Sequence, residues 1–342
     1  MNKSLQSIQI LRAIACISVV YSHITLKFGT FGLDIFFVIS GFVMAKLISN
    51  NTRPKKFIID RISRIIPLYW LLTTLLILIT IFFPKLLNTN TFNFIYYLKS
   101  IFFIPYYNHN NYLQPLIIVG WTLNYEIFFY FCIFFSIIIN KKKYYLIVLF
   151  FFIFFNTIIK NFYIENIYEL IIFFSNPIIF EFFFGIIAFY LYKFNRNLII
   201  KPYKIVILSV ISYGFMAYYE TNNTILNDYL RLFFYGIPSF TLVLSLCFLE
   251  KCFIKNSILT KKIIDIGNAS YSIYLTHLFV LGFVNLVNYK LNIINVSTFT
   301  GSLLIIFLCI IIGKLTYDFI DKPISNYTKK ILYLKFNNYT IR

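Results

Sequence analysis

Charged residues are scarce in this chain. Only 13% of its 342 residues are charged, whereas an ordinary soluble domain carries roughly a quarter. Glycine and proline are also few, with 11 and 9 residues, and neither an internal repeat nor a long polar linker interrupts the sequence. Hydrophobic residues make up 60% of the chain, and the mean hydropathy is +0.78. A water-soluble core cannot hide so much apolar surface, so the composition excludes soluble domains and predicts a membrane protein.

The cysteines lack the spacing that is typical of a metal site or a disulfide framework. Four of the five lie within apolar runs, and the fifth follows such a run. Because free cysteine behaves as a small hydrophobic residue, we expect structural cysteines and no bound metal. The five are Cys16, Cys132, Cys247, Cys252 and Cys309.

Long apolar runs are what the chain has instead. A membrane-spanning helix needs about 20 mostly apolar residues, and ten segments of this kind predict an all-α, polytopic transmembrane bundle that forms one domain, 1–342. The segment 94–107 suits an interfacial or re-entrant piece, with a loop as the alternative. Arg12, inside the first run, argues against a cleaved signal peptide. The ten expected spans are 8–26, 32–49, 64–83, 116–139, 144–160, 171–192, 205–219, 229–249, 268–288 and 299–319.

The net charge of +19 has two explanations. In a soluble protein, such an excess of Lys and Arg would suggest a nucleic-acid partner. In a membrane protein, basic residues gather in the cytoplasmic loops. With the N-terminus in the cytoplasm, 21 of the 31 Lys and Arg residues fall in the inner loops and tails and 5 in the outer loops. This split predicts that both termini are cytoplasmic and that no nucleic acid is bound.

Ionisable side chains inside the spans are costly and often functional. Arg12 and His23 are 11 residues apart, close to three helical turns, so both lie on one face of the first span, about 16 Å apart along its axis. The structural alternatives are a snorkelling Arg12 and a satisfied interfacial His23. Asp34 opens the second span, where it can hold the His23 imidazole in one tautomer or cap the helix. Gly41 permits a close helix contact.

Two arginines stand at the cytoplasmic boundary of the third span. Arg61 and Arg64 are three residues apart and therefore share a helix face. Guanidinium groups bind phosphate through two parallel hydrogen bonds, which favours an anionic ligand. The alternative is that both residues are ordinary positive charge of a cytoplasmic loop.

Two carboxylates and a histidine lie deep within later spans. Glu126 and Glu181 are expected near mid-membrane, where each needs a partner or a proton. Both suit a structural pairing with Arg12 or Arg231, and Glu126 also suits a catalytic role. His277 lies in the ninth span.

Five motifs, in this order and over nearly the whole chain, resemble the acyltransferase-3 family of integral-membrane acyltransferases, which modify bacterial sugars. In the fourth motif Thr122 replaces the usual Ser, and Asp321 stands where the exit motif usually has Glu. A soluble hydrolase-like domain does not follow, so a stand-alone membrane form is expected. The motifs are the basic-x10-His pair Arg12 and His23, the run Gly32–Phe42, the pair Arg61 and Arg64, Trp121–Glu126 and Tyr271–His277.

The resemblance implies an acyl-CoA donor, usually acetyl-CoA, that enters from the cytoplasm. It also implies transfer to a hydroxyl of a cell-surface or lipid-linked carbohydrate, in the inner membrane of a bacterium and in contact with its lipid. CoA is polyanionic, so a cationic inner end suits it. The donor-binding residues are then Arg12, Arg61 and Arg64, and the substrate-binding residues are Trp121, Tyr271 and His277.

The acceptor hydroxyl needs a base, because an alcohol is a poor nucleophile at neutral pH. His23 is the expected general base, with Glu126 or Asp34 as its orienting carboxylate. We expect direct attack of the hydroxyl on the thioester, and an acyl-histidine intermediate is the alternative. A different class of protein, a glycolipid transporter or flippase with a buried proton relay, would use the same polar residues. Inverted repeats would favour that class, and the sequence does not show them.

Overall fold

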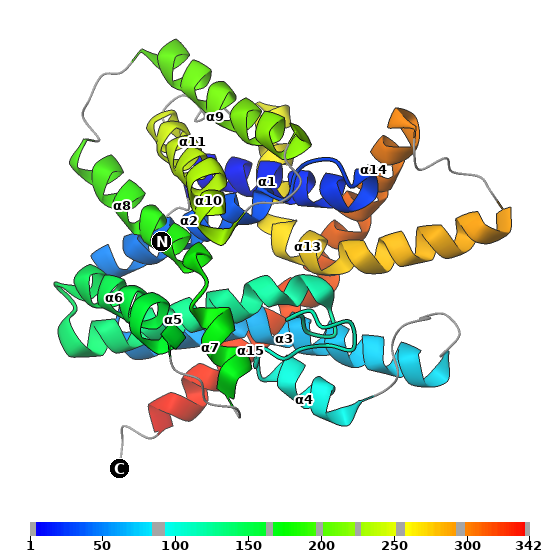
Figure 1. Cartoon of the computed structure of the whole chain (residues 1–342), viewed down its shortest axis with the longest axis horizontal. Helices are drawn as coiled ribbons and strands as arrows, with labels where there is room; N and C mark the ends of the chain where they lie inside the picture. Colours follow the sequence, from blue (N-terminus) through cyan, green and yellow to red (C-terminus); the bar gives the residue numbers. More distant parts are fainter. Residues whose placement is uncertain are drawn as a thin grey trace. The chain divides into compact units, whose positions relative to one another are not determined.

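In the computed structural model of the chain, the described residues form helices joined by turns and loops, with one isolated β-bridge between Tyr107 and Leu113. This agrees with the all-α class predicted from the sequence. Figure 1 shows the helices in sequence colours. The described residues are 5–83, 93–161, 167–195, 201–222, 227–250, 257–291 and 298–338.

The chain divides into two compact units, and each unit is built from segments that are distant in the sequence. Unit 1 comprises Met1–Asn51 and Pro177–Leu315, and unit 2 comprises Thr52–Asn176 and Thr316–Arg342. The expected single domain 1–342 stays a prediction.

Unit 1 contains most of the helices that carry ionisable residues. The helix α2 packs chiefly on α8, and α1 packs chiefly on α13. The elements are α1 (Gln6–Thr25), α2 (Gly32–Ser49), η6 (Pro177–Ile179), α8 (Phe180–Phe194), α9 (Pro202–Asn222), α10 (Asp228–Arg231), η7 (Leu232–Gly236), α11 (Ile237–Phe248), α13 (Ile258–Leu291) and α14 (Phe299–Thr316).

Unit 2 is organised around α3, which contacts α5, α4 and α15. Its elements are α3 (Pro54–Phe82), α4 (Phe94–Ile101), η2 (Ile118–Gly120), α5 (Trp121–Asn140), α6 (Tyr144–Ile153), η3 (Phe154–Ile158), η4 (Ile159–Asn161), α7 (Tyr168–Phe174), η8 (Tyr317–Asp321) and α15 (Lys322–Asn338).

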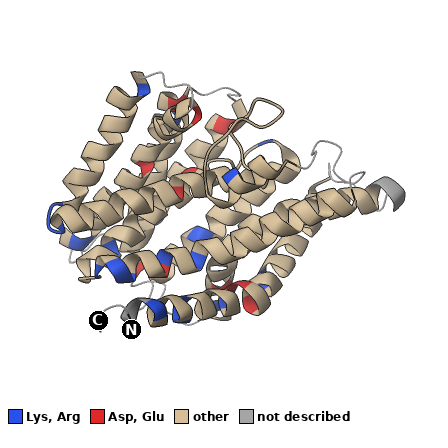
Figure 2. Cartoon of the chain, turned by 90° about the horizontal axis from the view of Figure 1, so that it is seen from below, with Lys and Arg blue, Asp and Glu red and all other residues tan. Residues whose placement is uncertain are grey.

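Nine helical segments within the described residues are long and apolar enough to cross a membrane, against ten predicted spans. The tenth, 205–219, is the helix α9, which falls outside that set. Serines and Glu220 interrupt its apolar residues and lower its hydropathy. The short helix α4 accounts for part of the segment 94–107. In Figure 2 most of the helix length is tan, so charged residues occupy few positions along these helices.

Glycines let α2 and α8 approach closely in unit 1. A Cβ added at Gly41 would lie 1.9 Å from the carbonyl oxygen of Phe182, and one added at Gly185 would lie 2.0 Å from that of Val38. Neither position leaves room for a side chain, because the obstructing atoms are backbone. The close helix contact predicted for Gly41 is therefore confirmed.

A glycine also allows α1 and α13 to approach closely. A Cβ at Gly267 would lie 1.9 Å from the backbone oxygen of Gln9. The Cys16 thiol, one turn beyond Arg12, donates to the carbonyl oxygen of Ser270 at 3.4 Å. These contacts fix the register of α1 against α13 and thereby decide which side chains of the two helices meet.

The first prediction concerns the α2–α8 contact. Gly41→Ala should destabilise unit 1 by about 1–3 kcal/mol, because the added methyl group overlaps backbone that cannot turn away. The measurement is the melting temperature of the protein in detergent. Gly214→Ala on α9 is the matched control, since nothing lies within 4 Å of its added Cβ. Equal melting temperatures for the two variants would contradict the packing argument.

Candidate functional site

Two histidines from opposite ends of the chain meet in unit 1. The rings of His23 on α1 and His277 on α13 have centroids 5.1 Å apart and planes tilted by 50°. His23 is exposed, whereas His277 is 0% exposed. The Nδ1 atom of His277 lies 2.6 Å from the carbonyl oxygen of Tyr274. Its other ring nitrogen, Nε2, is buried without a hydrogen-bond partner among the described residues.

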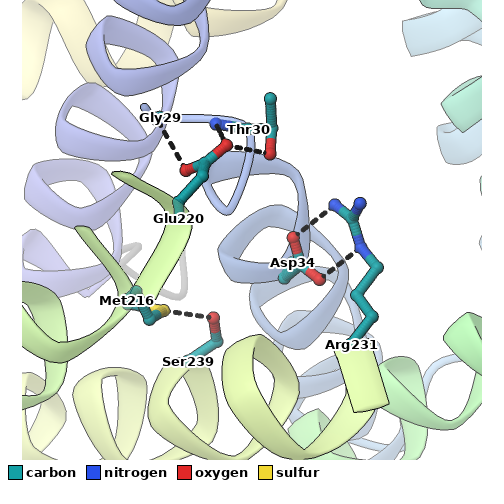
Figure 3. A network of polar contacts seen from close by, with 7 residues as sticks. All are labelled: Gly29, Thr30, Asp34, Met216, Glu220, Arg231 and Ser239. Atoms are coloured by element: carbon teal, nitrogen blue, oxygen red, sulfur yellow. Dashed lines mark hydrogen bonds and ion pairs between the residues drawn. The ribbon is translucent and has the colours of Figure 1, made fainter. Parts of the chain in front are cut away.

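Asp34 forms a buried ion pair in the first turn of α2. The guanidinium of Arg231 donates from Nε to Oδ1 at 2.9 Å and from Nη2 to Oδ2 at 2.7 Å (Figure 3). The Asp34 side chain is 0% exposed and that of Arg231 is 24% exposed. Both carboxylate oxygens are therefore occupied by Arg231. The helix begins at Gly32 without a side-chain cap, so the alternative of Asp34 as an N-cap is wrong.

Glu181, on α8, joins this ion pair. Its side chain is completely buried, and neither carboxylate oxygen accepts a hydrogen bond from the described residues. It interacts electrostatically with Asp34 and Arg231, and its Oε1 would lie 3.2 Å from a Cβ at Gly236. The sequence-based pairing of Glu181 with Arg231 thus has a structural counterpart, with Asp34 as the third member. The structure thus places two buried carboxyl groups beside one guanidinium.

Glu220, on α9, holds the loop between His23 and Asp34. Its carboxylate accepts from the backbone N–H of Gly29 at 2.7 Å, from the backbone N–H of Thr30 at 3.0 Å, and from the Thr30 hydroxyl (Figure 3). Three hydrogen bonds to one carboxylate fix the turn that joins α1 to α2. The sequence analysis missed Glu220, because its partners lie 190 residues away.

Arg12, near the start of α1 in unit 1, is half-buried and lies near the Cys16 thiol. The first turn of α1 is capped by Glu250, whose two oxygens accept from the backbone N–H groups of Gln6 and Ser7, each at 2.8 Å. A carboxylate at a helix N-terminus satisfies free donors and complements the helix dipole. The start of α1 is therefore anchored independently of its histidine end.

In unit 2, three of the other predicted residues lie close together. Tyr130, one turn after Glu126 on α5, donates its hydroxyl to the Glu126 carboxylate. Arg61 and Arg64 on α3 both interact electrostatically with Tyr130. The structure therefore brings Glu126, Arg61 and Arg64 around one tyrosine. Tyr130 was missed from the sequence, although its i+4 spacing from Glu126 is the signal that could have identified it.

One nitrogen of this cluster, on Arg61, makes no hydrogen bond among the described residues. The Nε of Arg61 is buried without a hydrogen-bond partner among the described residues. On the same helix, Asp60 binds Lys329 at 2.6 Å and accepts from the Tyr333 hydroxyl at 3.2 Å. The nearest acid in sequence is thus paired with α15. A buried guanidinium N–H without a hydrogen-bond acceptor is suited to bind an anionic ligand.

The remaining predicted residues have simpler environments. Trp121 is half-buried at the start of α5, with its ring 5.8 Å from that of Tyr125. Tyr271 is half-buried on α13. Asp321 is buried at the end of the π-helical turn η8. Thr122 donates its hydroxyl to the carbonyl oxygen of Val119, a bond that Ser in its place would also form.

The cysteines that the structure describes do not take part in the clusters described above. Four cysteines are free and buried, and Cys252 lies outside the described residues. Groups of three or more possible metal ligands are absent from the described part of the chain.

These features define a multi-pass helical membrane protein with ionisable groups held inside its spans. A family model described as an acyltransferase domain (Acyl_transf_3) matches residues 5–315, which include segments of both units. The chain belongs to this acyltransferase-3 family, as the five motifs indicated.

Two characterised relatives are similar over part of their length. The exopolysaccharide production protein ExoZ of Rhizobium meliloti is 38% identical over 112 residues, covering 32% of this chain and 33% of that protein. The peptidoglycan O-acetyltransferase OatA of Listeria monocytogenes is 32% identical over 97 residues, covering 25% of this chain and 16% of that protein. The alignments thus span a third or less of either relative. No solved structure matches the chain.

The second prediction concerns the Asp34–Arg231 pair. Arg231→Met should lower stability by on the order of 3 kcal/mol, because it leaves a buried carboxylate without its cation. The double variant Asp34→Leu with Arg231→Met should lose less, since it removes both charges. Both effects are read as melting temperatures in detergent.

The half-exposed pair Lys99–Glu169, at 3.2 Å, is the matched control. Lys99→Met should cost no more than about 1 kcal/mol, because water screens an exposed ion pair. A double variant at Asp34 and Arg231 that is less stable than Arg231→Met alone would refute the buried-charge argument.

Proposed function

We propose that this chain is an O-acetyltransferase of the bacterial inner membrane. It transfers an acetyl group from acetyl-CoA to a hydroxyl of a cell-surface or lipid-linked carbohydrate. Family membership supports acyl transfer, and the relatives' names, exopolysaccharide production and peptidoglycan O-acetylation, support a glycan acceptor. The observation that carries the proposal is His23, an exposed imidazole on an otherwise largely buried helix.

His23 is the general base in this proposal. Its ring takes the proton of the acceptor hydroxyl while the hydroxyl oxygen forms a bond to the thioester carbon. The carbon–sulfur bond then breaks, and the imidazolium returns the proton to the CoA thiolate. The products are the acetyl ester and CoA, and the base is regenerated. Direct attack of this kind needs both substrates bound together, whereas an acyl-histidine would release CoA before the acceptor binds.

The cations at the inner ends of the spans are proposed to bind the donor. CoA carries several phosphate charges, and guanidinium groups bind phosphate through paired hydrogen bonds. Arg61, Arg64 and Arg12 are the proposed ligands, and the unused Nε of Arg61 supports this role. The donor side is cytoplasmic if the positive charge of the inner loops sets the topology.

The other site residues have supporting roles in this proposal. Glu126 acts as a catalytic carboxylate whose orientation is fixed by the Tyr130 hydroxyl. Asp34 contributes through its ion pair with Arg231, which fixes the start of α2. Trp121 and Tyr271 are half-buried and are proposed to contact the acceptor, since aromatic faces suit the apolar faces of sugar rings.

The third prediction tests the base. His23→Ala should lower acceptor-dependent release of CoA from acetyl-CoA by about 100-fold or more, since loss of a general base typically costs 10²–10⁴ in rate. The measurement uses membranes that contain equal amounts of protein and a glycan acceptor. A transporter would not release CoA in this assay.

His109→Ala is the matched control, because His109 is the third histidine of the chain and lies exposed outside the spans. It should keep full activity. Retained activity in His23→Ala would remove His23 from catalysis, and ping-pong kinetics would replace direct attack by the acyl-enzyme route.

The fourth prediction tests the donor site. Arg61→Ala and Arg64→Ala should each raise KM for acetyl-CoA about tenfold or more with a smaller change in kcat, because a charge-assisted hydrogen bond is worth roughly 1.5–3 kcal/mol. Lys56→Ala, an exposed cation on the same helix, is the control and should leave KM unchanged. Unchanged KM in both arginine variants would exclude them from the donor site.

A further inference from the structure

His277 is buried where a substrate cannot reach it. Its side chain is 0% exposed, and its neighbours are the rings of Tyr274 at 5.9 Å and His23 at 5.1 Å between centroids. The ring of Phe36, on α2, also lies near Tyr274, with ring centroids 6.2 Å apart. A direct contact with the acceptor does not fit this burial, so the role expected for His277 in binding substrate needs to be replaced by another.

The tautomer of His277 follows from its hydrogen bond. A carbonyl oxygen only accepts, so the Nδ1 atom that lies 2.6 Å from the Tyr274 oxygen carries the proton. Burial without a counter-charge favours the neutral ring. In the neutral ring the second nitrogen, Nε2, then has a free lone pair. This lone pair is buried and has no donor among the described residues, which is a costly state that a functional partner would explain.

His23 is the donor within reach. A hydrogen bond needs about 2.7–3.2 Å between nitrogens, and a ring nitrogen lies roughly 1 Å from its ring centre, so centroids 5.1 Å apart permit an N–H···N bond once the nitrogens face each other. The His23 ring is on the exposed side and can turn without disturbing the core. Catalytic hydrogen bonds are often long without substrate and tighten when it binds.

We propose that His277 is the positioning residue of the base: its Nε2 accepts a hydrogen bond from the His23 ring and holds the opposite nitrogen toward the acceptor hydroxyl. When His23 takes the hydroxyl proton, it becomes an imidazolium and keeps this hydrogen bond. The Nε2 lone pair of His277 then stabilises the positive charge on the His23 ring. His277 itself neither gains nor loses a proton. This inference rests on the proposed function, because it gives the base the third group that triads use.

The test compares two residues of similar length at position 277. His277→Gln keeps an acceptor oxygen near the place of Nε2, whereas His277→Met does not. The expected result is a fall in kcat of roughly 100-fold for His277→Met, with partial recovery in His277→Gln and unchanged KM values for acetyl-CoA and the glycan. Thr276→Val, at the neighbouring buried position on α13, is the control and should keep full kcat.

A double-mutant cycle separates positioning from structure. Adding His277→Met to His23→Ala should cause no further loss of kcat, because the two groups act as one unit. An additive loss, equal kcat in the Gln and Met variants, or a rise in the KM for the glycan would overturn the proposal. These outcomes differ from failure of the proposed function itself, in which the unmodified protein would show no acceptor-dependent release of CoA.

Discussion

The bidentate ion pair of Asp34 and Arg231 is the interaction on which unit 1 depends. Burying either charge alone would cost several kcal/mol. Asp34 and Arg231 must therefore lie within hydrogen-bond distance of each other in the folded protein. The pair joins the first turn of α2 to the end of α10, and Glu181 brings α8 to the same point. Three elements from distant parts of the sequence are thereby held at one place.

Close backbone contacts between helices add to this ion pair in fixing the structure of unit 1. The backbones of α2 and α8 touch at Gly41 and Gly185, so the two helices have one register. Glu220 fixes the turn that begins α2, by binding the backbone at Gly29 and Thr30. Since this turn directly follows the helix of His23, the same contacts limit where the end of α1 can lie. The position of His23 is therefore constrained in part by groups that do not contact it.

Much of the fold could be predicted from the sequence, because an apolar run of spanning length is a local property. Nine predicted spans match helices of that kind, while α9 carries too many polar residues to follow the rule. The shared face of Arg12 and His23 also follows from helical period alone. Partners are different: Arg231 is 197 residues from Asp34, and His277 comes from the ninth expected span. Only tertiary packing selects such partners, so the sequence could mark the residues but could not decide between their possible partners.

A base in a membrane protein faces two opposing requirements. It must be open to its substrate, and yet one of its nitrogens must be held in a defined direction. A carboxylate is the stronger orienting acceptor, but Asp34 shows what it needs inside this fold, namely a guanidinium with two aligned donors. A neutral imidazole in the place of His277 offers an acceptor without adding a second charge. In the proposed mechanism, the exposed His23 acts as the base and the buried His277 orients it, which meets both requirements at low electrostatic cost.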